Sequence, residues 1–422
     1  MASRLRHDGH EVRLLDLMFA RSPAVEAAQA AREFQPNLVG YSLRNVDNQS
    51  AVSFFDPLPS VKSVVSAVKE VCPAPSLLGG TAFSTFPVQY LQALEAEYGL
   101  AGDDLDPISA FVASLAAGQP DLSAPGLVFR ADGAIRCNPF EIRGYADTRF
   151  DGWDLLDFRA YRRSFDSFWE AGIVARTGCP FDCVYCDTFR TFGREWVLRD
   201  PGQVAEELIT LSRRYGVRSV FLADAGFNRP LDHAKAVMEA FIRARTRVSL
   251  SGVFEPGEVD AEFARLFRRA GGEMMMVFAG SLSDAVLEAT RKPFVLSDVI
   301  TGANTLREAG VPYALSLMLG APGETKETVE ETLSRGEKLP TVYTWIERGF
   351  RVEPRTALRD IAVAEGVISP DDDGFQAKFY HSPATPPAWL DDRMKAYTRA
   401  HQWSQVRGLP WMARLVWNKL RP

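Results

Sequence analysis

Cysteine and histidine are scarce in this sequence, with five residues of each among 422. So few cysteines argue against the dense disulfide framework of small secreted scaffolds. No apolar run of about 18 residues occurs, so no membrane span is expected, and the first residues contain no apolar segment of a secretory signal. Together these absences indicate a protein of the reducing cytoplasm.

An excess of positive charge is also missing. The chain has 48 Lys and Arg residues against 54 Asp and Glu, a net charge of −6, with both signs mixed along its length. We therefore expect no nucleic-acid partner. What is present is an ordinary apolar content of 46%, in a chain long enough for two or three domains with sizeable cores.

Three of the five cysteines lie close together, in Arg176-Thr-Gly-Cys-Pro-Phe-Asp-Cys-Val-Tyr-Cys-Asp187. Cys179, Cys183 and Cys186 have the spacing C-x3-C-x2-C, and iron–sulfur clusters are held by cysteine thiolates at such short spacings. Three ligands leave one iron of a four-iron cluster open to a small molecule. A structural zinc site usually needs a fourth Cys or His nearby, and the nearest downstream histidine, His233, stands alone.

This motif resembles the signature of the radical S-adenosylmethionine (SAM) superfamily, in which an aromatic residue usually precedes the third cysteine, as Tyr185 does here. The resemblance extends over roughly residues 165–360. It implies that the three cysteines hold a 4Fe-4S cluster whose open iron chelates the amino and carboxylate groups of SAM. Electron transfer, from a donor such as flavodoxin or ferredoxin, would then cleave SAM to a 5′-deoxyadenosyl radical.

Strand-like and helix-like segments alternate after the cysteines. The pattern predicts a helix from Asp200-Pro201 to Gly216, which supply a cap, an N1 proline and a terminating glycine. Further helices are expected near 231–245 and 258–270, two within 283–309, and one from about 326; strands are expected at 219–224, 248–254, 274–280, 313–320 and 345–352. The strand at 274–280 lacks polar alternation and is predicted to be buried on both faces. This alternation predicts a parallel sheet, which suits the partial (β/α)6 barrel of the superfamily, with chemistry at the carboxyl ends of the strands.

Residues at those strand ends are the candidates for binding SAM. Asp224 begins a segment that resembles D-x-x-F-N of relatives, and Leu319–Thr325 resembles their G-x-P-G-E-T loop. The alternative is that Pro322-Gly323 is only a turn and Glu324 only a helix cap. Relatives often carry Gly-Ile-Glu-Ser after the fourth strand; here the segment is Phe278-Ala-Gly-Ser281, so that carboxylate is missing and Ser281 would retain part of its role. The predicted SAM contacts are Tyr185, Asp224, Glu255, Ser281, Gly320 and Pro322.

The sequence pattern of the N-terminal region predicts a flavodoxin-like α/β unit. A helix end followed by a strand is expected over 9–16, strands at 36–43 and 76–81, helices at 58–71 and 86–98, and a short strand with an acidic loop at 99–104. Such sheets bind ligands beyond the carboxyl ends of their strands. An ordinary nucleotide-type unit, or a docking domain without a ligand, stays open as an alternative.

The unit resembles the cobalamin-binding domain fused to many radical SAM enzymes, on the evidence of Gly9-His-Glu-Val, Tyr41–Asp47 and Gly79-Gly80. The resemblance implies that the strand ends contact the corrin or its nucleotide tail; the expected residues are Ser42, Leu43, Arg44, Asn45, Gly79, Gly80 and Thr81. No D-x-H-x-x-G motif occurs, so a lower histidine ligand to cobalt is not expected. The family usually begins with another strand and a Pro-Pro loop, so the sheet is expected to be shortened or the start misassigned.

The expected organisation is a cobalamin-binding domain at 1–125, a linker at 126–165, the radical SAM barrel at 166–365 and a helical C-terminal region at 366–422. That last region holds Trp389, Trp403, Trp411 and Trp417. A packed helix that covers the barrel is favoured there, with a substrate lid or a membrane-surface contact as alternatives. Cys72 and Cys137 are isolated and are expected to be small apolar residues rather than ligands.

These resemblances together imply a cobalamin-dependent radical SAM C-methyltransferase that methylates an unactivated carbon of a small molecule in a biosynthetic, natural-product pathway. A radical cyclisation, ring rearrangement or oxidation with the same cofactors is the nearest alternative, and a cobalamin-binding sensor is a more distant one. A methylthiotransferase is disfavoured because only Cys72 and Cys137 remain for a second cysteine set. The substrate, the catalytic acid or base and the oligomeric state cannot be read from the sequence.

Overall fold

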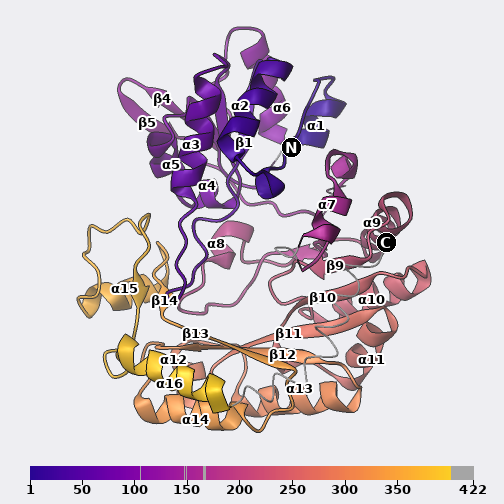
Figure 1. Cartoon of the computed structure of the whole chain (residues 1–422), viewed down its shortest axis with the longest axis vertical. Helices are drawn as coiled ribbons and strands as arrows, with labels where there is room; N and C mark the ends of the chain where they lie inside the picture. The colour runs from indigo at the N-terminus through magenta and orange to yellow at the C-terminus, as the bar shows by residue number, and fades with distance from the viewer. Residues whose placement is uncertain (105, 147, 149, 165–167, 401–422) are drawn as a thin grey trace.

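The computed structural model describes residues 1–104, 106–146, 148, 150–164 and 168–400. Two sheets, each with its own helices, make up this part of the chain (Figure 1). None of its helices combines the length and the apolar character needed to cross a bilayer. Trp403, Trp411 and Trp417 lie outside the described residues.

The N-terminal sheet has five strands in the order of the chain. β1 (Val39–Ser42), β2 (Ser76–Gly79) and β3 (Tyr98–Leu100) are parallel, and β4 (Leu127–Ala131) and β5 (Ala134–Cys137) follow as an antiparallel extension. The accompanying helices are α1 (Ala2–His7), η1 (Leu17–Phe19), α2 (Pro23–Phe34), α3 (Leu58–Lys69), α4 (Thr81–Thr85), α5 (Pro87–Ala93) and α6 (Asp106–Ala116). Side chains alternate across the sheet, so Leu77 packs in one core cluster with Phe111 and Leu78 in another with Phe83.

The strand predicted within residues 9–16 is absent, because this segment is irregular between α1 and η1. In a doubly wound sheet of order 2-1-3-4-5, the second strand pairs with the first. Among the described residues this segment pairs with no strand, and β1 stands at the edge of the sheet. Leu14 and Leu15 are consequently 39% and 42% exposed.

The second sheet has six parallel strands, again in the order of the chain. They are β6 (Ala171–Ile173), β9 (Ser219–Leu222), β10 (Ser249–Phe254), β11 (Gly272–Gly280), β12 (Tyr313–Leu319) and β13 (Tyr343–Arg348). Between them run α9 (Pro201–Tyr215), α10 (Leu231–Ala244), η3 (Pro256–Glu258), α11 (Ala261–Arg269), α12 (Asp284–Ala289), α13 (Leu296–Glu308) and α14 (Lys326–Gly336). The predicted α/β class with a parallel sheet is confirmed, and the predicted domain limits stay predictions.

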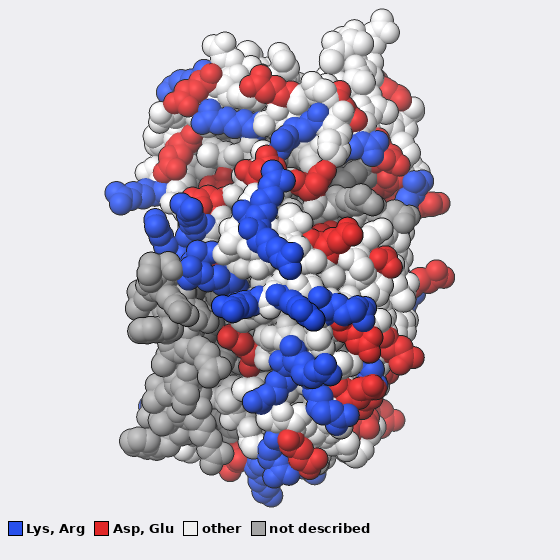
Figure 2. Space-filling model, turned by 90° about the vertical axis from the view of Figure 1, so that its right-hand side faces the viewer, with Lys and Arg blue, Asp and Glu red and all other residues white. Residues whose placement is uncertain are grey.

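Local signals set the helix ends as expected. Asp200 accepts a hydrogen bond from the Gln203 amide at the start of α9, and Gly216 ends that helix in the left-handed conformation. The last turns of α9, α10 and α11 carry arginines, which favourably face the negative ends of the helix dipoles. Figure 2 shows Lys and Arg side chains in a band across one face of the molecule, with acidic side chains beside it.

The prediction that β11 is buried on both faces is wrong at Phe278, which is 36% exposed. Phe278 is in register with Ser316 of β12, and Ser316 with Trp345 of β13. Trp345 is 50% exposed. The inner face of the open sheet is therefore accessible near the carboxyl ends of its strands. The described helices pack on the opposite face of the sheet.

Smaller elements surround the carboxyl ends of the barrel strands. The described residues also form two short antiparallel pairs, β7 (Arg176–Thr177) with β8 (Val197–Leu198) and β14 (Phe350–Arg351) with β15 (Phe379–Tyr380). The remaining helices are η2 (Gly152–Leu155), α7 (Phe158–Arg163), α8 (Thr188–Phe192), α15 (Ala357–Ala364) and α16 (Pro387–Ala400). α16 packs Leu390 against Leu319 and Leu333, as a covering helix should, and Trp389 is partly buried beside them.

Candidate functional site

The three clustered cysteines lie in the loop that follows β7. Gly178, just ahead of Cys179, has φ +82°, and a Cβ there would collide with the backbone oxygen of Glu195. Only glycine fits this position without a shift. The Cys179 amide donates to the Gly193 carbonyl at 2.9 Å, and Cys186 donates to the Cys183 carbonyl at 3.1 Å. The backbone thus fixes the loop, and all three cysteine side chains remain partly exposed.

Burial raises the pKa of all three thiols, that of Cys183 to about 12, and the neighbouring Cys186 raises the pKa of Cys179 and Cys183 further. Binding to iron requires the thiolate, so metal would replace the thiol protons. Within the described ranges, no three His, Cys, Asp or Glu side chains are placed to share one metal ion. A four-iron cluster does not need such convergence, since each cysteine would bind a different iron, and the loop fits that group.

Asp224 follows β9, but the structure commits its carboxylate to the protein. It is 4% exposed, and it accepts hydrogen bonds from the backbone amides of Ala175 at 3.1 Å and Arg176 at 2.6 Å. Burial raises the pKa of Asp224 to about 6, against the opposing effect of the Arg176 guanidinium. Asp224 therefore holds the strand that leads into the cysteine loop, and its predicted contact with SAM stays a prediction.

Asn228, the last residue of the D-x-x-F-N segment, is fully buried and holds the end of β10. Its amide nitrogen donates to the carbonyls of Glu255 at 2.8 Å and Glu258 at 2.7 Å, and its oxygen accepts from the Glu255 amide at 2.8 Å. Glu255 itself is partly exposed, and its Oε2 atom has no hydrogen-bond partner among the described residues. The segment therefore positions a carboxyl group with one buried oxygen that has no hydrogen-bond partner among the described residues.

Sequence reasoning missed Lys292, which lies beside the cysteine loop. Its Nζ atom is 5.5 Å from the ring centroids of both Tyr185 and Phe294. Burial disfavours its charge, but Tyr185, Glu255 and Cys183 outweigh that effect and raise the pKa of Lys292. The lysine is therefore an ammonium. A lysine after α12 belongs to no motif, so nothing in the linear sequence singled it out.

The hydroxyl of Ser281 has partners within the protein, and its predicted contact with SAM stays a prediction. Ser281 is 2% exposed and lies between β11 and α14, where its hydroxyl is 2.9 Å from the Thr332 hydroxyl and accepts from the Ser283 amide at 3.2 Å. The hydroxyl is thus engaged on the helix side of the sheet.

The loop after β12 is braced by Glu324. This residue is fully buried and accepts hydrogen bonds from the amides of Gly320 and, at 3.1 Å, Ala321. Burial raises the pKa of Glu324 to about 7. The N-cap of α14 is Thr325, so the alternative that Glu324 is only the cap of this helix is wrong. Gly320 has φ +91°, with His381 and Leu390 close to the position of a Cβ, so glycine is required there by conformation and packing.

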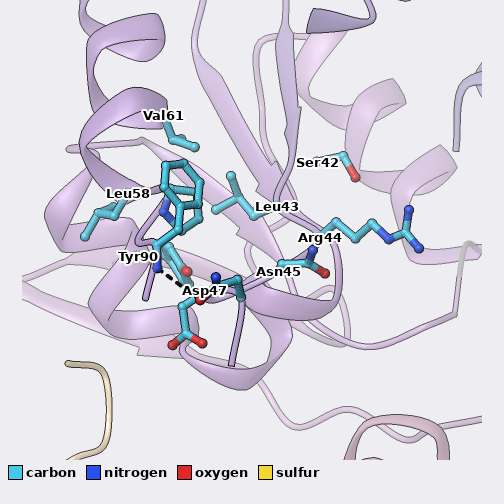
Figure 3. Close-up of a pocket in the computed structure, with 11 residues that line it drawn as sticks. Ser42, Leu43, Arg44, Asn45, Asp47, Leu58, Val61 and Tyr90 are labelled. Carbon is cyan, nitrogen blue, oxygen red and sulfur yellow. Dashed lines mark hydrogen bonds between the residues drawn. The ribbon is translucent and has the colours of Figure 1, made fainter. Parts of the chain in front are cut away.

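A cavity of about 250 Å³ opens at the carboxyl end of β1 (Figure 3). Its wall is lined by Ser42, Leu43, Arg44, Asn45, Asp47, Asn48, Phe55, Pro57, Leu58, Val61 and Tyr90. The first four are residues expected to contact cobalamin. The wall is apolar on the side of α3 and polar along the strand end, which fits part of a large ligand with an apolar ring and amide arms.

Gly79, Gly80 and Thr81 do not line this cavity. Gly80 has φ +98°, and a Cβ there would collide with the backbone of Leu43. The Leu43 amide donates to the Gly79 carbonyl at 2.7 Å, and the Thr81 hydroxyl donates to the Arg44 carbonyl. These three residues therefore support the backbone at the end of β1 without lining the cavity. Their predicted contact with a nucleotide tail stays a prediction.

The cavity and the cysteine loop are linked through the loop between β1 and α3, which descends from the N-terminal sheet to β14 (Figure 1). Asp47 of the cavity wall forms an ion pair with Arg351 of β14 at 2.5 Å, and Arg351 also pairs with Glu353 at 2.8 Å. Phe350 packs on Tyr185 of the cysteine loop, with ring centroids 4.9 Å apart. The two candidate sites are thus on facing parts of the two units.

Comparison with known proteins gives one family and several distant relatives. Residues 173–335 match the radical SAM superfamily. The tryptophan 2-C-methyltransferase of Streptomyces laurentii is 23% identical over 425 residues, which cover 85% of this chain and 70% of that protein. The anaerobic magnesium-protoporphyrin IX monomethyl ester cyclase of Synechocystis is 26% identical over 294 residues, covering 67% of this chain and 56% of that enzyme.

A solved structure is similar over nearly the whole length. The radical SAM methyltransferase TsrM from Kitasatospora setae, with cobalamin and a [4Fe-4S] cluster bound, has a TM-score of 0.80 at 21% identity. The likeness covers 93% of this chain and 86% of that protein. At this identity it establishes a common fold, with both sheets included.

Proposed function

Because residues 173–335 form a radical SAM domain, we propose that this protein is a cobalamin-dependent radical SAM enzyme that methylates an unactivated carbon of a small molecule. The tryptophan methyltransferase and TsrM support methyl transfer and a fold that accommodates both cofactors. A natural-product substrate is part of the proposal. So is a flavodoxin or ferredoxin as electron donor.

One observation carries the proposal: the cavity at the end of β1 and the cysteine loop belong to different sheets, yet the loop from β1 to α3 connects them. Ser50 of that loop donates to Glu347 of β13 at 3.1 Å, in addition to the buried pair of Asp47 with Arg351. An enzyme that passes a group from one cofactor to a substrate activated by another needs both beside one space. The contacts of the β1–α3 loop with β13 and β14 support such an arrangement in this chain.

The chain's own residues supply binding, orientation and exclusion of water. When bound, SAM on the cluster supplies radical chemistry and cobalamin supplies a transferable methyl group. Cys179, Cys183 and Cys186 would hold the cluster. Tyr185, which directly precedes Cys186, is held by its contact with the Phe350 ring and lies 5.5 Å from Lys292 Nζ.

On the cobalamin side, the proposed contacts are the wall residues at the end of β1. Leu58, Val61 and Tyr90 offer an apolar surface, and Asn45 offers a polar group on the opposite side (Figure 3). Phe54, further along the same loop, packs on Phe379 with ring centroids 5.9 Å apart. This contact closes part of the junction and would limit the access of water to the space between the cofactors.

The test is an anaerobic reconstitution of the full chain with iron, sulfide and hydroxocobalamin, followed by desalting and an absorption spectrum. Stoichiometric cobalamin beside a 4Fe-4S cluster is the expected result. SAM labelled in its methyl group would then be incubated with candidate small molecules, and the product mass followed. A cluster without cobalamin would overturn the proposal, and Cys183→Ala is the matched control that should keep cobalamin while losing the cluster.

The second candidate is a cyclisation or oxidation with the same cofactors. The similarity to the cyclase of Synechocystis favours it, since that match also reaches two thirds of this chain. The two functions differ in one readout. A methyltransferase adds one labelled methyl group to the product, whereas a cyclase changes the substrate mass without incorporating label.

A further inference from the structure

Three side chains form a row across the inner face of the six-stranded sheet. Phe278 of β11 is in register with Ser316 of β12, and Ser316 with Trp345 of β13. The neighbouring residues Val277 and Leu317 are buried in the core that the sheet forms with its helices. Because side chains alternate along a strand, the row lies on the face away from those helices.

The row forms a slot, in which the small Ser316 lies between the rings of Phe278 and Trp345. Neighbouring strands are about 4.8 Å apart, so the backbones at the two ends of the row are separated by about 10 Å. Side chains stand roughly perpendicular to a sheet. Aromatic rings in contact have centroids about 4.5–7 Å apart, so two successive contacts span about 9–14 Å. The slot therefore has the width to hold one planar ring.

Both rings of the slot are accessible to a ligand. Phe278 is 36% exposed and Trp345 is 50% exposed, and Ser316 is half-buried between them. Binding sites for small molecules are lined mainly by apolar and aromatic side chains with a few polar groups. In barrels of this kind, chemistry takes place near the carboxyl ends of the strands. The slot is therefore well placed to hold a substrate.

The Trp345 indole is held in its orientation by the N-terminal unit. Its Nε1 atom donates to Glu347 Oε1 at 3.0 Å, and the Ser50 hydroxyl donates to Glu347 Oε2 at 3.1 Å. Ser50 belongs to the loop from β1 to α3, whose residues Asp47 and Asn48 line the cavity at the end of β1. A ring that is ordered before binding loses less conformational entropy when a ligand stacks on it.

The charge beside the slot is negative. In β11, β12 and β13 as the structure describes them, the positions on this face carry one charged side chain, that of Glu347. Arg348, the next residue, is paired with Asp391 of α16 at 2.5 Å. A carboxylate in this place repels an anionic ligand and favours a neutral or cationic one.

We infer that Phe278 and Trp345 clamp a planar aromatic ring of the substrate over Ser316, with Glu347 and Ser50 as positioning residues for Trp345. The inference rests on the proposed function and deepens it, because it names the class of small molecule, one with a neutral or cationic aromatic ring. The Ser316 hydroxyl lies at the floor of the slot, where it can donate to or accept from a polar atom at the ring edge.

The experiment is anaerobic equilibrium dialysis of the reconstituted full chain against three compounds. 2-Naphthol is planar and neutral, decahydro-2-naphthol has the same carbon skeleton with saturated rings, and naphthalene-2-sulfonate is planar and anionic. The wild type should bind 2-naphthol most tightly. Phe278→Leu and Trp345→Leu should each weaken 2-naphthol about two- to tenfold, because leucine keeps apolar contact but cannot stack. The affinity for decahydro-2-naphthol should not change.

Two variants test the positioning role of the polar residues. Ser50→Ala should weaken 2-naphthol without changing decahydro-2-naphthol, since a less ordered Trp345 ring loses stacking but not apolar contact. Glu347→Gln keeps an acceptor for the indole and removes the charge, so the affinity for naphthalene-2-sulfonate should rise. A purely structural role of either residue would shift all three affinities together.

Two further variants test the slot itself. Ser316→Leu places a larger side chain between the two rings and should abolish the binding of 2-naphthol. Phe19→Leu is the matched control, because Phe19 of η1 has the same 36% exposure as Phe278 but lies outside the barrel. Iron content and thermal unfolding of each variant show whether the cluster and the fold are intact.

The outcomes separate the inference from the proposed function. If the wild type binds 2-naphthol no more tightly than decahydro-2-naphthol, or does not bind it saturably, the slot does not select a planar ring and the inference is wrong. Equal weakening of both compounds by the two leucine variants would also overturn it, because general packing would then explain the loss. A reconstituted chain without cobalamin or methyl transfer would overturn the proposed function alone, since these affinities require neither.

Discussion

Asp47 and Arg351 form an ion pair at 2.5 Å in which both side chains are almost wholly buried, with exposed fractions of 2% and 3%. Asp47 belongs to the loop after β1, and Arg351 lies in β14 beyond the barrel. Arg351 also donates to Glu353 and to the Gly374 carbonyl. One guanidinium thus compensates two buried carboxylates across the junction of the two units.

Arg351→Met should therefore destabilise the protein by about 3–5 kcal/mol, because it leaves buried carboxylates without their cation. Denaturant unfolding of the cofactor-free chain measures this change. Arg136→Met is the matched control, since Arg136 and Asp132 form an exposed pair, 58% and 82% accessible, whose loss should have no measurable effect. Equal stability of the two variants would show that the junction does not depend on Arg351.

The free energy of unfolding should decrease as the pH rises through the range in which Glu324 loses its proton. Burial raises its pKa from the ordinary value of 4.5 to about 7. A carboxyl group with a raised pKa in the folded state stabilises the fold fully below pH 4.5, and this contribution is lost as pH rises toward 7. The loss can reach about 1.4 kcal/mol per pH unit in that window.

Glu324→Gln removes this titration, so the stability of the variant relative to the wild type should increase between pH 5 and about 7. Denaturant unfolding of both proteins without cofactors, at several pH values, measures the difference. A difference that stays constant with pH would contradict the assignment. Glu327→Gln, at an exposed residue in the first turn of α14, serves as the control.

The strand–helix alternation of the barrel could be read from the sequence because its signals are local. Asp200 and Gly216 bound α9 by capping alone, and glycine at 178 agrees with the tight turn before Cys179. The strand expected within 9–16 failed for the opposite reason. A strand needs a neighbour, and pairing partners are not encoded in the segment itself.

Side-chain roles in the site could be predicted less well, since they depend on residues distant in the chain. Nothing in the linear sequence indicated that Asp224 accepts hydrogen bonds from the amides of Ala175 and Arg176, or that the Ser281 hydroxyl lies beside that of Thr332. Lys292 reaches Gly280 only because the α12 turn brings it back over the strand end. Such contacts are properties of the tertiary fold.

Gly178→Ala should prevent normal assembly of the cysteine loop. The new methyl group would collide with the Glu195 carbonyl, in a backbone conformation that already disfavours alanine. Iron and sulfide per chain after reconstitution should fall several-fold. Gly118→Ala is the matched control, because Gly118 has a similar φ of +75° but open space around it. Equal iron content in both variants would mean that the collision is relieved without cost.

Val61→Trp should separate the two cofactor sites. Val61 lies in the wall of the 250 Å³ cavity at the end of β1, opposite the polar residues of the strand end. An indole there would fill much of the cavity, so cobalamin retained after desalting should fall at least about tenfold, while the iron content stays that of the wild type. Val25→Trp, at a residue that is 66% exposed, is the control for the added bulk. If Val61→Trp still retained stoichiometric cobalamin, the ligand would have to bind elsewhere on the sheet, and the wall residues Ser42 to Asn45 would lose their proposed role.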